Sequence, residues 1–294
     1  MDHRALFKSV VVGTVIVLNA ALGLCQDPGT VRRVTSGRIA FCWCPPGEFQ
    51  AGSSEAEPGR DPDERQSKIV LSSGFWIGQT EITEAQWNAV DLSNVDASIA
   101  TLAASSSGDH YPQTRISWHA AADYCDHLNK FVLLESEALR KKGKFSESTA
   151  VNPEEFFRLP TEAEWEYACR AGTSTAFSCG DQLESISAAS WFRDVTPGVT
   201  LSQAQFVGKK TANPFGLLDV HGNAWEWCRD SYELQRTFGT DPEVLTTSSL
   251  RVHRGGSWRY PSNRARSANR DGRAAEYESD DIGFRIVLAS KKAE

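Results

Sequence analysis

The stretches Gly222-Asn223-Ala224-Trp225-Glu226-Trp227 and Arg254-Gly255-Gly256-Ser257-Trp258 are the most distinctive in this sequence, and Ile282-Gly283-Phe284-Arg285 follows them. Each combines glycine with aromatic or apolar residues within a few positions. Such short runs, interrupted by glycine, are typical of short strands and tight loops rather than of long helices. We therefore expect the chain from Phe206 onward to consist mainly of short strands and loops.

The N-terminal half carries helix signals. Thr83-Glu84-Ala85-Gln86 and Thr161-Glu162-Ala163-Glu164 each fit a capping box. In such a box the threonine hydroxyl and the side chain three residues later satisfy free backbone N–H groups. Apolar residues recur at helical spacing over residues 118–130, which predicts a third helix.

Strand signals surround these helices. The alternating segment 39–44 predicts a strand, and residues 69–71 and 75–77 are expected to form two short strands paired with each other. Residues 94–108 and 134–154 are expected to be insertions. A few helices, many short strands and long loops together predict a mixed α+β domain with much irregular structure.

Composition limits the class of protein. The chain has 294 residues, 40% of them hydrophobic, which is enough for one sizeable core and indicates one main domain. The 31 basic and 38 acidic residues give a formal net charge of −7, and no basic run is dense enough to follow a phosphate backbone. We therefore expect no nucleic-acid partner.

The N-terminus has the features of a signal peptide. Basic residues precede the apolar segment 9–18, and small residues follow it. We expect residues 1–23 to be a signal peptide, 24–37 a linker and 38–290 the folded domain, with export to the periplasm or the extracellular space. Two alternatives stay open: the apolar segment anchors the chain in a membrane, or Cys25 carries a lipid.

Export would place the remaining cysteines in an oxidising compartment. They would allow up to three disulfides, in pairings that the sequence leaves open; they are Cys42, Cys44, Cys125, Cys169, Cys179 and Cys228. Cys42 and Cys44 alternate with Trp43 and so lie on the same face of a strand, which disfavours a bond between them. No cysteine or histidine spacing suits a structural zinc ion.

The order of the motifs resembles that of the formylglycine-generating enzymes, also called sulfatase-modifying factors. Besides the three C-terminal stretches, the resemblance is carried by PPGEF (45–49), GFWI (74–77), EIT (81–83), ISW (116–118) and RLPTEAEWE (158–166). It covers residues 38–289 in the family's order. It implies an α+β fold that is a variant of the C-type-lectin-like domain, low in regular secondary structure and stabilised by calcium.

The best-known members of this family oxidise a sulfatase cysteine to formylglycine with O2 and a copper ion. Two cysteines just after the Gly-Gly-Ser-aromatic motif hold that copper. The resemblance places Tyr260 and Ala265 at these positions, and no cysteine follows Trp258. Since Cu(I) at such a site requires thiolates, we expect neither copper nor the family's oxidation.

The family's calcium site is better matched. The resemblance implies that the side chains of Asp219 and Glu226 and the backbone carbonyls of Gly222 and Ala224 hold one Ca2+ ion, a donor set that suits this cation. The alternative is that Glu226 pairs with an arginine such as Arg254.

The resemblance also implies a pocket. Trp225, Ser257 and Tyr260 match positions that line the family's active site, although Trp225 is equally compatible with a place in the core. The histidines show no metal-binding spacing, so solvated or capping roles are expected for them. The arginines over residues 259–273 mix with Asp271, Glu276 and Asp280 and are expected on a solvated, salt-bridged surface.

Two functions are compatible with these features. The first is an exported enzyme of the family whose oxidative chemistry, on a protein or a metabolite, differs from sulfatase activation. The second is a noncatalytic lectin-like module that binds a peptide or a glycan. Convergence of redox-competent groups near Ser257 and Tyr260 would favour the first. Apart from the signal segment or a lipid anchor, no membrane partner is expected.

Overall fold

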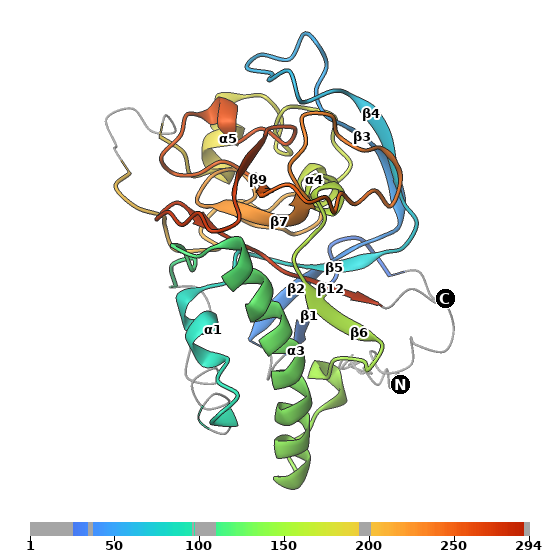
Figure 1. Ribbon diagram of the computed structural model, residues 1–294, viewed down its shortest axis with the longest axis vertical. Coiled ribbons are helices and arrows are strands. Elements are labelled where there is room, and N and C mark those ends of the chain that lie inside the picture. The colour runs from blue at the N-terminus through green and yellow to red at the C-terminus, as the bar shows by residue number, and fades with distance from the viewer. Residues whose placement is uncertain (1–25, 35–37, 96, 98–109, 194–200, 291–294) are drawn as a thin grey trace, which may run out of the picture.

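The computed structural model describes residues 26–34, 38–95, 97, 110–193 and 201–290. It is a mixed α+β structure in which three small sheets and a few helices are joined by long loops (Figure 1). This agrees with the fold class that the sequence predicts.

The largest sheet has five antiparallel strands in the order β1 (Val31–Val34), β2 (Ile39–Cys44), β5 (Phe75–Gly78), β12 (Val287–Ser290) and β6 (Glu155–Arg158). Its two edges are β1 and β6, yet Arg32 of β1 donates to both oxygens of Glu155 in β6 at 2.7 and 2.9 Å. The sheet is therefore curled enough for one ion pair to join its edges. Because β1 lies inside the segment expected to be a linker, the folded domain extends back at least to Val31 rather than beginning at residue 38.

The second sheet has the order β10 (Arg270–Ala274), β9 (Leu250–Arg254), β7 (Trp225–Ser231) and β11 (Ile282–Gly283). The third has the order β3 (Gly47–Ala51), β4 (Ser67–Leu71) and β8 (Gly239–Thr240). Since β4 pairs with β3 and β8, whereas β5 pairs with β2 and β12, the predicted pairing of residues 69–71 with 75–77 is wrong.

Both predicted capping boxes are confirmed. Thr83 caps α1 (Glu84–Ala89) and Thr161 caps α4 (Glu162–Arg170), each with the reciprocal bond from the third residue. The third helix, α3 (Trp118–Lys141), is longer than predicted and takes up the first part of the expected insertion 134–154. In Figure 1 its C-terminal turns project away from the body. Further helical elements are α5 (Leu183–Ala189) and the 3-10 turns η1 (Glu147–Thr149) and η2 (Ser262–Arg264).

The strand β7 separates two apolar clusters. Trp225 and Trp227 pack in the cluster that includes β2, β12 and α3, whereas Cys228 packs in the cluster that includes α4. This division follows from the alternation of side chains along a strand. The side chains of Trp225 and Cys228 therefore point to opposite faces of β7.

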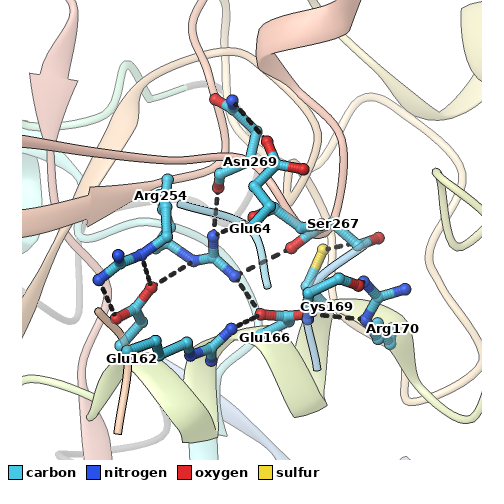
Figure 2. A network of polar contacts seen from close by, with 12 residues as sticks. Glu64, Glu162, Glu166, Cys169, Arg170, Arg254, Ser267 and Asn269 are labelled. Carbon is cyan, nitrogen blue, oxygen red and sulfur yellow. Dashed lines mark hydrogen bonds and ion pairs between the residues drawn. The ribbon is translucent and has the colours of Figure 1, made fainter. Parts of the chain in front are cut away.

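A buried ionic network ties α4 to β9 and β10 (Figure 2). Glu166 accepts hydrogen bonds from Arg170, Arg236 and Arg254, and Glu162 accepts two from Arg270 at 2.7 and 2.8 Å. Burial alone would raise the pKa of Glu162, but Arg270, Arg236 and Arg254 outweigh it and lower the pKa to about 2. These carboxylates therefore remain ionised inside the protein.

The prediction that the arginines of residues 259–273 are solvated is wrong for Arg266 and Arg270, which are 2% and 3% exposed. The partner of Arg270, Glu162, lies 108 positions away in sequence. Arg254 bonds to Glu166 at 2.6 Å. The alternative prediction, that Arg254 pairs with Glu226, is therefore wrong.

The six cysteines that the sequence allows to form up to three disulfides are not bonded to one another in the described part of the chain. All six cysteines of the described residues are unpaired, and five of them are buried. Burial raises the pKa of Cys169 to about 12 and that of Cys228 well above its ordinary value, so these thiols stay protonated. Cys25 lies outside the described residues. Among the residues that the structure describes, no helix has the length and apolarity needed to span a bilayer.

Candidate functional site

Trp225 stands at the centre of an aromatic group. Its ring centroid lies 4.6 Å from that of His253 and 6.0 Å from that of Tyr260, the latter in an edge-to-face arrangement. β7 supplies Trp225 and the neighbouring β9 supplies His253, which is paired in register with Trp227. Trp225 is only 4% exposed, so it belongs to the core as well as to the expected pocket.

The glycines of the Arg254-Gly255-Gly256-Ser257-Trp258 stretch explain how Ser257 reaches this group. Gly255 and Gly256 have φ values of +96° and +74°, in the left-handed region that favours glycine. A Cβ on Gly256 would lie 2.8 Å from the carbonyl oxygen of Arg264 and 2.9 Å from the Cα of Ala265. Only glycine therefore lets this turn pack against the 264–265 segment.

Asp281 organises the polar side of the group, and the sequence reasoning missed it. Its Oδ2 accepts a hydrogen bond from the Ser257 hydroxyl at 2.8 Å, and its Oδ1 accepts one from the Ser279 hydroxyl. Its backbone carbonyl accepts the Trp225 N–H at 2.9 Å. Its position directly before the Ile282-Gly283-Phe284-Arg285 stretch was the signal that could have identified it.

His253 is buried rather than solvated, which corrects the prediction. Burial lowers its pKa to about 4, and Arg273 acts in the same direction, so the ring is neutral at pH 7. Its Nδ1 has no hydrogen-bond partner within the described part of the chain. His221 is also buried, with its pKa lowered by burial to about 4, and it bonds to Ser178 and to the Ala265 carbonyl.

Tyr260 and Ala265 stand where the formylglycine-generating enzymes have their two copper-binding cysteines. Neither side chain contains sulfur, and the two pack into different apolar clusters. Tyr260 packs against the cluster that contains Trp225, whereas Ala265 packs with Phe177, Ile186 and Phe192. Cys228 lies on the face of β7 opposite to Trp225. Within the described residues, that thiol therefore cannot replace a missing cysteine beside Tyr260.

The expected calcium ligands lie in one loop that leads into β7. Asp219 has a φ of +59° and is 1% exposed. Its Oδ2 accepts a hydrogen bond from the Gly208 N–H at 2.6 Å, whereas its Oδ1 has no hydrogen-bond partner within the described residues. Gly222 has φ of +94°, and a Cβ there would lie 2.0 Å from the Trp191 carbonyl oxygen. Glycine at this position thus permits the close approach of residue 191.

Glu226 is already bonded to other groups. Arg285 donates to both of its oxygens, at 2.5 and 2.6 Å, and the indole N–H of Trp165 donates to Oε2 at 2.7 Å. The arginine that pairs with Glu226 is therefore Arg285. Oε1 accepts only one of these bonds, and a carboxylate oxygen has two acceptor sites.

Glu81 adds a carboxylate that the sequence reasoning did not include. It is fully buried, its Oε1 accepts a hydrogen bond from Asn223 at 2.9 Å, and its Oε2 has no partner within the described part of the chain. Burial raises its pKa well above the ordinary value, as do the charges of Asp219 and Glu226. Burial likewise raises the pKa of Asp219 to about 6.

These observations fit a divalent cation. Three buried carboxylates lie near the cations Arg285 and Lys210, and two carboxylate oxygens have no partner within the described residues, which is costly for buried acceptors. Among the described residues no group of three or more His, Cys, Asp or Glu side chains is arranged to hold a metal ion. A site here would therefore depend on backbone carbonyls, as the expected donor set does.

Comparison with known proteins defines the class. Residues 31–290 match the sulfatase-modifying factor enzyme 1-like domain, so the chain belongs to this family, that of the formylglycine-generating enzymes. It is similar to the formylglycine-generating enzyme of Streptomyces coelicolor, with 33% identity over 44% of this chain and 46% of that protein. It is also similar to the inactive C-alpha-formylglycine-generating enzyme 2 of Bos taurus, with 28% identity over 60% of this chain and 50% of that protein.

The matched regions thus span about half the length of these two relatives. Among solved structures, the fold is similar to that of PvdO from Pseudomonas aeruginosa, with a TM-score of 0.68 and 22% identity over 90% of this chain and 99% of that one. This likeness confirms the C-type-lectin-like fold of the family.

Proposed function

We propose that this protein is an exported member of the family that does not perform the copper-dependent oxidation of cysteine to formylglycine and acts instead in an altered oxidative modification of a protein or metabolite. The observation that carries the proposal is the replacement of the thiolate positions by Tyr260 and Ala265, which pack into different clusters. Without two sulfur donors, the site cannot hold Cu(I) as the family's chemistry requires.

The aromatic group supports a changed activity rather than a purely structural role. Tyr260, Trp225 and His253 are groups that can donate an electron or a hydrogen bond, and the Trp225 ring centroid lies 4.6 Å from that of His253 and 6.0 Å from that of Tyr260. The neutral His253 keeps an unpaired Nδ1, and Asp281 holds the Ser257 hydroxyl. Tyr260 is the partly exposed member of this group, so its ring would make the contact with a substrate.

We also propose that one Ca2+ ion is held by the side chains of Asp219 and Glu226 and by the backbone carbonyls of Gly222 and Ala224. The Oδ1 of Asp219, which has no hydrogen-bond partner within the described residues, supports this proposal, because a divalent cation would satisfy it. The ion would fix the loop that leads directly into Trp225. Its role would be structural, and it would take no part in the oxidation.

The test is incubation of the full chain with copper, O2 and a peptide containing the Cys-x-Pro-x-Arg sulfatase motif. The Streptomyces coelicolor enzyme serves as the positive control. We expect mass spectrometry to show the peptide cysteine unchanged with this protein and converted with the control. Formylglycine formed by this protein at a rate near that of the control would refute the proposal.

The second candidate function is a lectin-like module that binds a peptide or glycan without catalysis. It is favoured by a separate cavity, away from Trp225, whose polar walls are described below. Retention of this cavity's ligand after Tyr260→Phe and His253→Ala substitutions, with no chemical change in any substrate, would support it over the first candidate.

A further inference from the structure

A cavity of about 560 Å³ lies between three loops, formed by residues 54–59, 174–181 and 262–266. Its size is within the range of roughly 300–1,000 Å³ that is usual for small-molecule sites. The third loop runs between Tyr260 and Arg266, but Tyr260 itself faces Trp225 and is not part of the cavity wall. The cavity is therefore distinct from the aromatic group described above.

Arg266 fixes two of the three loops to each other. It is 2% exposed, and its guanidinium bonds to Glu57 at 2.7 Å, to Glu64 at 2.6 and 2.8 Å and to the Gly59 carbonyl at 2.6 Å. Its Nε donates to the Asn263 carbonyl at 2.9 Å. The wall formed by residues 54–59 and 262–266 is thus held in place before any ligand arrives.

The loop of residues 174–181 is held in place by hydrogen bonds to residues outside the cavity wall. The N–H and hydroxyl of Ser178 lie 3.0 and 2.8 Å from Nε2 of the buried His221, and the Ser267 N–H donates to the Ala176 carbonyl at 2.7 Å. Phe177, on this loop, packs against Ala265. A site whose walls are already ordered loses less entropy when it binds a ligand.

The charges of the cavity exclude acidic ligands. Its one cation, Arg266, is neutralised by Glu57 and by the buried Glu64. Asp181, exposed on the opposite loop, adds a further negative charge, and its Oδ1 accepts a hydrogen bond from the Ala176 N–H at 3.1 Å. A phosphate, sulfate or carboxylate would meet net repulsion here.

The donors and acceptors are those that recognise hydroxyl groups. Asp181 and Glu57 offer carboxylate oxygens, Asn263 offers an amide, and serines and a threonine line the same walls; the serines are Ser54, Ser174 and Ser262, and the threonine is Thr175. Phe177 and Pro58 supply apolar surface between them. This mixture matches a sugar ring, which has hydroxyls around its edge and C–H groups on its faces.

We propose that this cavity binds a saccharide without acidic groups, a neutral sugar or an amino sugar. The hydroxyls would donate to Asp181 and Glu57 and accept from Asn263, and the apolar face of the ring would contact Phe177. An amino group would gain an additional ion pair with Asp181, so amino sugars bind more tightly than neutral ones.

The test is isothermal titration of the full chain with three trisaccharides: a chitosan trimer, cellotriose and trigalacturonate. We expect the amino sugar to bind most tightly, the neutral sugar to bind more weakly and the acidic sugar not to bind. Absence of binding by both of the first two, or equal binding of the acidic one, would overturn the proposal.

Three variants connect any binding to the cavity. Asp181→Asn keeps the side-chain shape and removes its charge, so amino-sugar affinity should fall about tenfold, the equivalent of about 1.4 kcal/mol. Ser174→Trp, at an exposed position, fills the cavity and should abolish binding of both sugars. Glu48→Gln, at the exposed ion pair with Lys68, is the matched control and should change nothing. Sugar binding that persists unchanged in Ser174→Trp, with native circular dichroism, would place the ligand elsewhere and refute the assignment.

Discussion

Replacing Glu166 by Gln tests whether the buried ionic network stabilises the fold. Glu166 is fully buried in α4, and its two oxygens accept four hydrogen bonds. Oε1 accepts from the Gly52 N–H at 2.8 Å and from Arg170 at 2.9 Å, whereas Oε2 accepts from Arg254 at 2.6 Å and from Arg236. Gln has almost the same shape, so the change alters charge and hydrogen bonding without opening a cavity.

The magnitude follows from the orientation of the amide. Whichever way the Gln side chain turns, its NH2 group faces two N–H donors and two hydrogen bonds are lost. Each bond to a charged group contributes roughly 1.5–3 kcal/mol, and breaking one partner of a buried ion pair costs about 3–5 kcal/mol in total. We therefore expect Glu166→Gln to lower the free energy of unfolding by about 3–5 kcal/mol.

The assay is equilibrium unfolding in urea at pH 7, with Glu48→Gln as the control, for which the exposed pair with Lys68 predicts a loss of at most about 1 kcal/mol. Burial alone would raise the pKa of Glu166, but the surrounding arginines lower it far below its ordinary value of 4.5. Its contribution is thus complete above pH 4.5 and decreases as the pH falls. The reasoning is refuted if the two variants have equal stability at pH 7.

Two further predictions concern metal binding and the thiols. At a free Ca2+ concentration of about 100 times the dissociation constant, EDTA should lower the melting temperature by about 5–10 °C. The Asp219→Ala variant should show no such difference. A wild-type melting temperature that EDTA leaves unchanged would reject the site. A thiol reagent should label the half-buried Cys179 of the folded protein before any other of the described cysteines, because burial raises the pKa of the other thiols strongly. Peptide mass spectrometry maps the labelled cysteines. Rapid labelling of Cys42 or Cys169 in the folded state would contradict this prediction.

Local signals in the sequence predicted local structure well. The capping boxes at Thr83 and Thr161 depend on residues within three positions, and both were confirmed. The series of motifs also predicted the family and its fold, because glycines such as Gly222 and Gly256 occupy turns that no other residue permits without strain.

Long-range pairing could not be predicted in the same way. The partners of Arg266 and Arg270, Glu64 and Glu162, lie 202 and 108 positions away, so a run of mixed charge resembled a solvated surface. Glu81 was missed as a neighbour of Asp219 for the same reason. The burial of His253 depends on β7 and β9 pairing, which a single sequence does not reveal.

The central claim, that the described part of the chain places no pair of sulfur ligands for copper beside Trp225, is tested most directly by Cu(I) binding to the folded full chain. Competition with a chromophoric Cu(I) chelator under anaerobic conditions measures the affinity, and X-ray absorption at the copper edge identifies the ligands. We predict that the chelator retains the copper and that Tyr260→Phe leaves the result unchanged. One tightly bound equivalent of Cu(I) with two sulfur neighbours would contradict the account.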